Sequence, residues 1–389
     1  MPGEIGTILA MVEHLQPIWV DDADGVAAVA DACASQGAMA LDTEADSLHS
    51  YFHKVCLIQV TADGGDFVID PLALRADDLA PLWRHVEDAS LSVLMHGADY
   101  DLRVLDRDYG VRIRGLVDTQ IMAQLLGEPK TGLAALLDQE LGVTLDKRHQ
   151  RADWGRRPLT RSQVTYAAAD TAYLADLARK LRTRLEQLGR WHWAVEEFAR
   201  LEQVRYVAPD PDPWAFERVK GVRALRGSER NRAYTLYQWR DREAQRLDTP
   251  PFKVLGNKPL VELARTAPER PAELADIDQL GPRFVRRWGR DVVRALRRPE
   301  AAPQRRPDRR RSDLPPSVVR RLKRLTAVRD EIAAELGLDP GLVCARACAT
   351  SVAEHEPVAR SSDELADAGL TGWRLEVLGS RFLSELADD

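Results

Sequence analysis

The stretch Gly37-Ala38-Met39-Ala40-Leu41-Asp42-Thr43-Glu44 decides how this chain folds and where its chemistry lies. Its apolar first part, residues 37–41, predicts a buried strand, and two acids two residues apart end that strand. Because successive strand side chains point to opposite faces, Asp42 and Glu44 share one face. Two such carboxylates repel each other unless a cation neutralises them, and Mg²⁺ or Mn²⁺ suits oxygen ligands of this kind. The stretch suggests a divalent-metal site, which acids elsewhere in the chain must complete.

The composition around this stretch sets the class of protein. With 389 residues the chain is too long for one core, which predicts two to four domains. We expect no transmembrane helix and no secretory signal, because no long apolar run occurs and the first twenty residues lack a basic start before an apolar core. Four scattered cysteines argue against a disulfide framework. These features predict a cytoplasmic protein without a membrane partner.

Short apolar runs predict strands early in the chain, and helical periodicity dominates afterwards. The expected strands are 37–41, 54–61, 66–70 and 91–95, with an Asp63-Gly64-Gly65 turn between the second and third. The expected helices of this part are 22–36, 79–86, 98–109, 119–126, 133–141 and one long helix over 160–188. This order predicts an α/β sheet with helices on both faces.

Proline-rich segments divide the chain into four parts. The run Pro209-Asp210-Pro211-Asp212-Pro213 predicts the end of a first domain, residues 1–208. A second, all-helical domain is expected over 209–298, and a third over 317–389. Between them, residues 299–316 form a basic linker rich in proline and arginine. The two helical domains resemble each other in layout, which indicates a diverged internal repeat.

Two further local patterns bear on partners. The net charge of −6 conceals a basic region, because eleven Lys/Arg face four Asp/Glu between Arg218 and Lys258. Such clustering on one module indicates a polyanionic partner. Cys344 and Cys348 stand one helical turn apart, where packing of small residues is favoured over half of a zinc site.

More acids follow later in the chain. The segment His96-Gly97-Ala98-Asp99-Tyr100-Asp101 follows a predicted strand and opens a helix, so Asp101 can project towards the end of the sheet. The alternative is that Asp99 and Asp101 only stabilise the start of that helix. In Tyr166-Ala167-Ala168-Ala169-Asp170, the tyrosine and the acid lie on one helix face, because residues four apart are neighbours there. The three alanines allow this helix to approach the sheet closely.

Taken together, D-x-E at 42–44, H-G-x-x-x-D at 96–101 and Y-x-x-x-D at 166–170 resemble the DEDD-type 3′–5′ exonucleases of the tyrosine branch. Other segments resemble ribonuclease D in particular. These are Asp118-Thr119-Gln120, Val143-Thr144-Leu145-Asp146-Lys147, Asp153-Trp154 and Arg157-Pro158-Leu159. Residues from about 215 to 298 resemble an HRDC domain, a helical nucleic-acid-binding module, and the third domain resembles a second, degenerate one.

This resemblance implies a fold and an activity. The implied fold is a mixed-sheet exonuclease domain of the ribonuclease H-like, DnaQ-like type, followed by two all-α HRDC-type domains. The implied activity is a 3′–5′ exoribonuclease that acts on RNA with a free 3′ end and releases nucleoside 5′-monophosphates. Precursors of stable RNA, such as transfer RNA, are the implied substrates. A DNA 3′–5′ exonuclease of the Werner type and a non-catalytic nucleic-acid-binding adaptor stay open as alternatives.

The resemblance also implies a role for each matching residue. Two divalent cations, Mg²⁺ or Mn²⁺, would clamp the attacking and leaving oxygens. Asp42 would bridge both ions, Glu44 and Asp170 would bind the ion that activates water, and Asp101 would hold the other. Tyr166 would orient the attacking water.

Four further residues are expected to bind substrate. Lys147, Arg151 and Arg157 belong to a basic loop before the tyrosine helix, where contact with the RNA backbone competes with a simply solvated face. His96 is the fourth candidate, as a phosphate contact, although packing at the strand end is the simpler interpretation of this residue.

Overall fold

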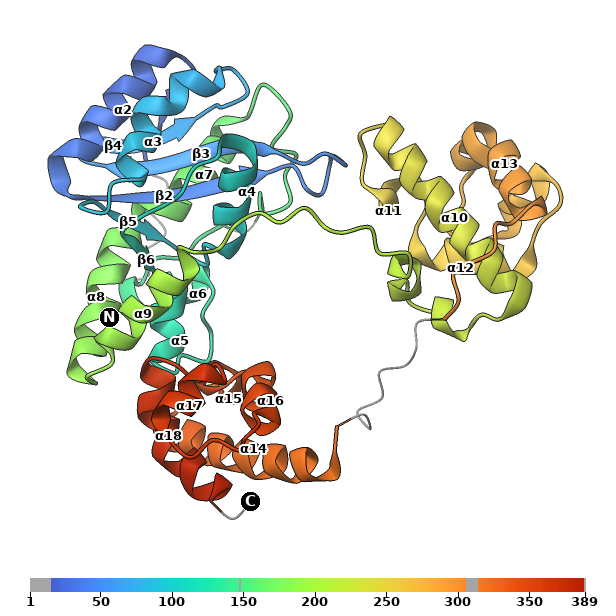
Figure 1. Ribbon diagram of the computed structural model, residues 1–389. Helices are drawn as coiled ribbons and strands as arrows, with labels where there is room; N and C mark the ends of the chain where they lie inside the picture. Colours follow the sequence, from blue (N-terminus) through green and yellow to red (C-terminus); the bar gives the residue numbers. More distant parts are fainter. Residues whose placement is uncertain (1–14, 147, 306–313, 388–389) are drawn as a thin grey trace, which may run out of the picture. The chain divides into compact units, whose positions relative to one another are not determined.

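The structure, a computed structural model, describes residues 15–146, 148–305 and 314–387 (Figure 1). The chain forms two compact units. The first combines Met1–Glu44, Val55–Tyr206 and Arg309–Asp389, and the second combines Ala45–Lys54 with Val207–Asp308. The domains predicted from the sequence, with boundaries at 208, 298 and 316, are continuous segments of the chain. In the structure, the first and last of these segments belong to one compact unit.

Within the described residues, six strands form one mixed sheet in the order β1-β4-β3-β2-β5-β6. The strands are β1 (Ile18–Val20), β2 (Ala38–Ala45), β3 (Val55–Ala62), β4 (Gly65–Ile69), β5 (Ser92–Met95) and β6 (Leu116–Asp118). Strands β3 and β4 are antiparallel, whereas β4 with β1, β2 with β5 and β5 with β6 are parallel. This mixed sheet confirms the predicted α/β class.

The stretch Gly37–Glu44 comprises the cap that ends α2 (Ala23–Gln36) and all of β2 except its last residue, Ala45. Gly37 ends the helix in the left-handed conformation, with φ of 68°, which glycine adopts without strain. Met39, Ala40 and Leu41 are buried in the sheet. The pairing of β2 with β5 covers only residues 38–40, so the acidic end of β2 extends beyond its neighbour.

Helices cover both faces of the sheet. The helices of the nuclease part are α2 (Ala23–Gln36), α3 (Ala80–Val86), α4 (Asp99–Tyr109), α5 (Thr119–Leu125), α6 (Leu133–Leu141), α7 (Arg161–Ala172), α8 (Leu174–Gln187) and α9 (Trp191–Leu201). Helices α2, α3 and α4 share one core with the sheet, and α5, α6, α8 and α9 share another. Helix α7 packs on β3 and β4 through Ala167 and Ala168. The helices therefore leave the end of β2 between α4 and α7.

The single helix expected over 160–188 is wrong, because the structure breaks it at Tyr173. The backbone of Tyr173 has φ of −112° and ψ of 2°, which lie outside the helical range. The Tyr173 side chain is buried in the core that α5, α6 and α8 share. The break lets α7 lie on the sheet while α8 packs against α5 and α6.

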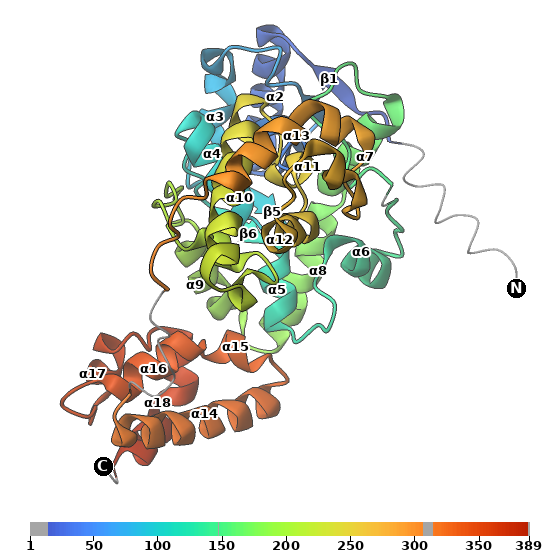
Figure 2. The ribbon, with the colours of Figure 1, turned by 90° about the vertical axis from the view of Figure 1, so that its right-hand side faces the viewer.

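The C-terminal helices complete the first unit. They are α14 (Pro316–Leu336), α15 (Pro340–Val343), α16 (Arg346–Glu354), α17 (Ser362–Asp367) and α18 (Trp373–Leu386), and they gather into one bundle (Figures 1 and 2). The bundle contacts α9, where the rings of Trp193 and Trp373 stack with centroids 4.7 Å apart. The Trp373 indole donates a hydrogen bond of 2.7 Å to Glu197, which also pairs with Arg374. One hydrophobic core runs through both parts.

The second unit has a core of its own, built around Phe216, Leu236, Leu260 and Val292. Its helices are α10 (Gly227–Arg246), α11 (Pro251–Val254), α12 (Asn257–Thr266) and α13 (Pro282–Arg297), with short 3₁₀ turns at Ala215–Arg218, Val222–Ala224 and Pro271–Asp276. In both this unit and the C-terminal bundle, a long helix (α10, α14) is followed by a four-residue helix that begins at proline (α11, α15). In the described part of the chain, every helix is too short or too polar to span a membrane.

Candidate active site

Four of the five predicted catalytic side chains line one pocket of about 460 Å³. Asp42 and Glu44 come from the end of β2, and Tyr166 and Asp170 from α7. The polar residues of the lining are Asp42, Glu44, His96, Gln120, Asp146, Gln150, Tyr166 and Asp170. Asp101, the fifth, is buried beside them in the first turn of α4. Three elements far apart in the sequence thus bring the predicted acids together.

Asp101 is held by Thr43, the residue between the two acids of β2. The Thr43 hydroxyl donates a short hydrogen bond to the Asp101 carboxylate. Asp118, at the end of β6, fixes the segment just before α4 by accepting from the backbone N–H groups of Gly97 at 3.0 Å and Ala98 at 2.8 Å. These two contacts determine where Asp101 stands relative to Asp42.

Helix α7 is positioned from both ends. Thr160 and Gln163 form a capping box at its N-terminus. Near its other end the hydroxyls of Thr61, on β3, and Thr171 are 2.9 Å apart. The Tyr166 ring stacks on the Trp154 ring, with centroids 6.0 Å apart and planes at 26°. Tyr166 therefore presents its hydroxyl from a fixed ring.

The pKa values of the four predicted metal-binding carboxyl groups are all raised above their usual values. Burial raises the pKa of Glu44 to about 9, of Asp170 to about 7 and of Asp101 to about 6. Burial, followed by the charges of the other three carboxylates, holds the pKa of Asp42 well above its usual value. Among the described residues that line the pocket, none is lysine or arginine. The cluster therefore lacks a positive charge from its own lining, and a divalent cation would supply it.

The donor set fits Mg²⁺ or Mn²⁺ in a particular way. Within the described residues, no three acidic, histidine or cysteine side chains converge closely enough to enclose an ion by themselves. Mg²⁺ is usually bound by one or two carboxylates, and completes its shell with water and substrate phosphates. Pairs of acids drawn from Asp42, Glu44, Asp101 and Asp170 match this requirement, with water and a phosphate-bearing substrate to supply the remaining oxygens.

Tyr166 stays protonated in this setting. Burial, and then the charges of Asp170, Glu44 and Asp42, raise the pKa of its phenol well above the usual value of a tyrosine. A phenol of this kind cannot act as a base near neutral pH, but it can donate a hydrogen bond. The geometry therefore agrees with the predicted role of orienting water.

His96 lines the same pocket and is anchored by its other ring nitrogen. The Nδ1 atom is 2.9 Å from the Thr119 hydroxyl, which itself donates to the Met95 carbonyl at 3.0 Å. The hydroxyl must then accept from Nδ1–H. Burial lowers the pKa of His96, so the ring is neutral near pH 7. A contact with phosphate stays a prediction.

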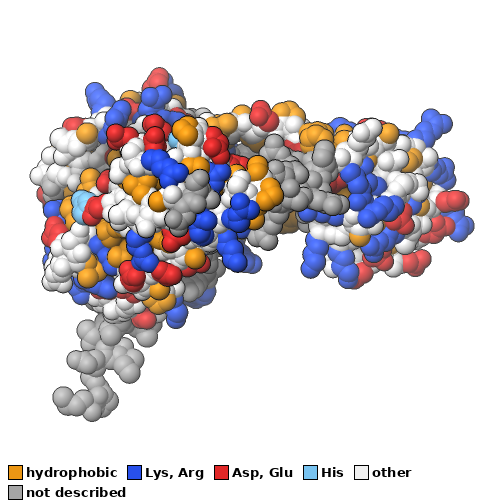
Figure 3. Space-filling model, turned by 60° about the horizontal axis from the view of Figure 1, so that its bottom comes forward, with side chains coloured by type: hydrophobic (Ala, Val, Ile, Leu, Met, Phe, Trp, Pro, Cys, Tyr) orange, Lys and Arg blue, Asp and Glu red, His pale blue; other side chains and the backbone are white. Residues whose placement is uncertain are grey.

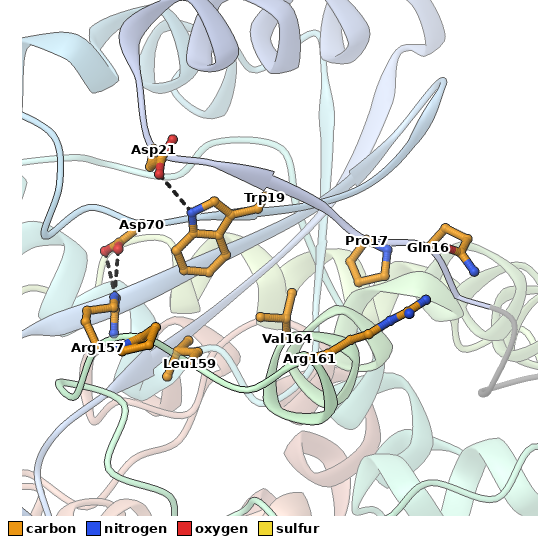
Figure 4. Close-up of a pocket in the computed structure, with 10 residues that line it drawn as sticks. Gln16, Pro17, Trp19, Asp21, Asp70, Arg157, Leu159, Arg161 and Val164 are labelled. Carbon is orange, nitrogen blue, oxygen red and sulfur yellow. Dashed lines mark hydrogen bonds and ion pairs between the residues drawn. The ribbon is translucent and has the colours of Figure 1, made fainter.

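The structure does not bring Arg157 to the acidic pocket. Its guanidinium donates two hydrogen bonds of 2.6 and 2.7 Å to Asp70 (Figure 4). It also donates to the carbonyls of Trp154 and Cys56. It also lies over the Trp19 ring, 5.8 Å from the centroid, in a separate pocket of about 660 Å³. These contacts hold the loop before α7 against the sheet, which is a structural role.

The other two predicted basic contacts are less defined. Arg151 is exposed in the loop before α7, and the lining of the acidic pocket does not include it. Lys147 lies outside the residues that the structure describes.

Gln120, Asp146 and Gln150 line the pocket although sequence reasoning did not assign them to it. For Gln120 a signal existed in the motifs. Gly97 has φ of +72°, and a Cβ atom there would lie 3.1 Å from the Gln120 side-chain oxygen. The glycine of H-G-x-x-x-D therefore makes room for the glutamine of D-T-Q.

Comparisons with known proteins agree on one family. A model described as 3′–5′ exonuclease matches residues 17–186, and a model of the HRDC domain matches residues 229–296. Ribonuclease D of Pseudomonas paraeruginosa is 32% identical over 375 residues, which cover 95% of this chain and 97% of that protein. The crystal structure of Escherichia coli RNase D, described as an exoribonuclease involved in structured RNA processing, matches with a TM-score of 0.67 and 26% identity over 96% of this chain and 99% of that one. The catalytic core of RRP6 from Trypanosoma brucei matches with a TM-score of 0.66 and 27% identity over 73% of this chain and 80% of that one.

Proposed function

The chain belongs to the ribonuclease D family of 3′–5′ exoribonucleases, and on this premise we propose that its acidic pocket removes nucleotides from RNA 3′ ends with two divalent ions. The products would be nucleoside 5′-monophosphates. The observation that carries the proposal is the meeting of β2, α4 and α7 at one pocket rich in carboxylates. Because the Escherichia coli relative is described as processing structured RNA, we propose structured precursors, transfer RNA among them, as substrates.

The side chains divide the work as follows. Bound Mg²⁺ or Mn²⁺ would supply an activated water and stabilise charge on the leaving oxygen. Asp42 is the proposed shared ligand, because all three other carboxylates act on its charge. Thr43 keeps Asp101 in place from β2. Tyr166 donates its phenolic hydrogen bond and orients the attacking water from a ring supported by Trp154.

The substrate and the direction of cleavage can be tested together. Single-stranded RNA and DNA of the same sequence, each labelled at the 5′ end, would be incubated with the full-length protein and Mg²⁺ or Mn²⁺. We expect a ladder shortened from the 3′ end on RNA, and chromatography should identify nucleoside 5′-monophosphates. Faster degradation of the DNA would favour the Werner-type alternative, and intact substrates throughout would favour the adaptor.

Replacing Tyr166 with phenylalanine tests the orienting role. The change removes only the hydroxyl, so kcat should fall by about 10²-fold while KM changes little. Tyr173→Phe is a matched control, because it removes the hydroxyl of a buried tyrosine that is not part of the pocket lining. Single-turnover kinetics would separate an effect on the chemical step from an effect on RNA binding. Unchanged chemistry with weaker RNA binding would make Tyr166 a substrate contact instead.

Helix α13 is the surface that we propose for RNA binding in the second unit. It carries six arginines within Pro282–Arg297, beyond the basic region noticed in the sequence. Figure 3 shows lysine and arginine side chains, in blue, together with acidic side chains, in red, on the body to the right. A pocket of about 460 Å³ on it is lined by Glu269, Arg270, Pro271, Arg290, Val293, Arg294, Arg297 and Arg298. Its size and charge suit phosphate groups.

The double substitution of Arg290 and Arg298 by alanine tests this surface. Both side chains are exposed, and loss of two phosphate contacts should reduce the slope of log affinity against log salt by about 1.4 for single-stranded RNA. Cleavage of a short RNA should keep its rate, since the acidic pocket is untouched. As a control, Arg246→Ala with Lys258→Ala removes two cations that pair with Glu243 and Asp278. Equal slopes for both double variants would exclude α13 as the anchor.

A further inference from the structure

The pocket of about 660 Å³ in the first unit is larger than the acidic pocket and shares no described lining residue with it. Its walls come from β1, at the edge of the sheet, and from the segment that leads into α7. Trp19, Leu159 and Val164 give the pocket an apolar surface (Figure 4). A volume of this size is typical of sites that hold one small organic molecule.

The Arg157 guanidinium, on one side of this pocket, is fully used within the protein. It donates five hydrogen bonds, two to Asp70 and three to backbone carbonyls. A guanidinium has five N–H groups, so Arg157 keeps none for a ligand. Its charge is also balanced, because the Asp70 carboxylate accepts both of the shortest side-chain contacts at 2.6 and 2.7 Å.

Arg161 is the other arginine of the lining, and its charge is available. It is exposed at the first position of α7, and Figure 4 shows its side chain extending away from Arg157, towards Gln16 and Pro17. Within residues 15–146, 148–305 and 314–387, no hydrogen bond or ion pair holds the Arg161 guanidinium. The pocket therefore has one cation that can bind an anionic group.

The Trp19 ring is held in place between the two arginines. Its indole donates a hydrogen bond of 3.1 Å to the Asp21 carboxylate, and Arg157 lies over the ring at 5.8 Å from the centroid. The ring is half-buried and extends from β1 into the pocket (Figure 4). The pocket thus combines a fixed aromatic ring with an acceptor, Asp21, on one side and a cation, Arg161, on the other.

We propose that this pocket binds one nucleotide, with its base stacked on Trp19 and its phosphate paired with Arg161. A base has a flat face that stacks on an aromatic side chain, and its N–H groups can donate to the Asp21 carboxylate. A phosphate accepts charge-assisted hydrogen bonds from a guanidinium. An apolar ligand would leave both charges unused, and an inorganic anion would leave the ring unused.

Two sources can supply this nucleotide. It can be a free nucleoside 5′-monophosphate, or it can be one unit of an RNA strand. The second source rests on the proposed function, whereas the first does not. A binding measurement in EDTA needs no cleavage, so its failure is distinguishable from a failure of the proposed nuclease activity.

Photocrosslinking of the full-length protein tests the site and separates the two sources. The probes are 5-iodouridine 5′-monophosphate and a short single-stranded RNA that contains 5-iodouridine, because an iodinated base crosslinks to an aromatic ring on which it stacks. We expect a crosslink to Trp19, the single tryptophan of the tryptic peptide 1–54. A crosslink with the monophosphate identifies a free nucleotide as a ligand, and a crosslink with the RNA alone identifies a unit of the strand. Absence of a crosslink at Trp19 with both probes would overturn the proposal.

Replacing Arg161 with glutamine tests the phosphate contact in the same assay. At a probe concentration below saturation, the yield at Trp19 should fall by about 10-fold, the scale of a lost hydrogen bond to a charged group. Arg156→Gln is the matched control, since Arg156 is exposed in the same segment but does not line the pocket. Excess uridine 5′-monophosphate should also compete with the crosslink. An unchanged yield in Arg161→Gln, or equal competition by inorganic phosphate, would reject a nucleotide site.

Replacing Trp19 with leucine tests stacking, because leucine keeps an apolar side chain but has no aromatic ring. Equilibrium dialysis with the probe that crosslinks should show affinity reduced by about 10-fold, and circular dichroism checks the fold. Trp191→Leu is the control: Trp191 is also half-buried, with Arg182 over its ring at 4.6 Å, but it lies outside the pocket lining. A folded Trp19→Leu variant with undiminished affinity would exclude stacking on this ring.

Discussion

Replacement of Asp42 by asparagine should reduce kcat by about 10³-fold or more, the scale seen when one member of a cooperating catalytic group is removed. The asparagine keeps the size of the side chain but loses the negative charge that we propose both ions share. Asp42 is the carboxylate on which Glu44, Asp101 and Asp170 all act, so its loss affects every ligand pair in the pocket. RNA binding by the basic second unit should persist.

Single-turnover cleavage of a labelled RNA measures this effect, and circular dichroism checks the fold of the variant. Asp99→Asn is the matched control. Asp99 stands in the same first turn as Asp101, but it is exposed and pairs with Arg103 at 2.9 Å. The control should cleave at the rate of the unaltered chain. A fully active Asp42→Asn variant would move the catalytic centre away from this pocket.

Removal of divalent cations should have an effect of similar size. Chelation with EDTA should stop cleavage, and added Mg²⁺ or Mn²⁺ should restore it, because the pocket carries four acids and no cation in its described lining. Because such ions complete their coordination shell with substrate phosphates, Mn²⁺ should bind more tightly when a non-hydrolysable RNA is present than to the free protein. Electron paramagnetic resonance of free Mn²⁺ measures that difference. Undiminished cleavage after exhaustive chelation would exclude a metal-dependent mechanism.

The chelated protein should also respond to pH in a defined direction. The pKa of Glu44 is raised to about 9 and that of Asp170 to about 7, so the folded state binds more protons than the unfolded chain above pH ~4. Stability therefore falls as the pH rises from about 4 to about 9. Thermal unfolding in EDTA should show this fall, and Asp42→Asn should weaken it by removing one buried charge. A rise of stability over this interval would contradict the raised pKa values of these buried acids.

Local spacing was sufficient to predict most of the pocket. Asp42 with Glu44, and Tyr166 with Asp170, are fixed relative to each other by the geometry of a strand and of a helix. The predicted family and mixed α/β fold are confirmed. The break at Tyr173, a residue buried in the core, was not predictable in the same way, because no glycine or proline marks it.

Contacts between distant residues account for what the sequence could not indicate. Thr43 bonds Asp101 across 58 positions, and Arg157 reaches Asp70 across 87, so neither partner is visible in a local pattern. Arg157 has the positive charge expected of a contact with the RNA backbone. In the structure, however, its guanidinium pairs with Asp70. The C-terminal bundle was expected as an appended module, but Trp373 joins it to the nuclease core.

The contact between Trp373 and α9 joins two segments that the ribosome synthesises at different times. Glu197 and Trp373 are 176 positions apart, so a ribosome adding about 5–20 residues per second needs roughly 10–35 s to make the partner of α9 after α9 itself. During that interval the face around Trp193 has no cover from α18 and is open to chaperones or to other nascent chains. A message truncated after the second unit would leave it open permanently. The contact between α18 and α9 therefore forms only after the second unit has been synthesised.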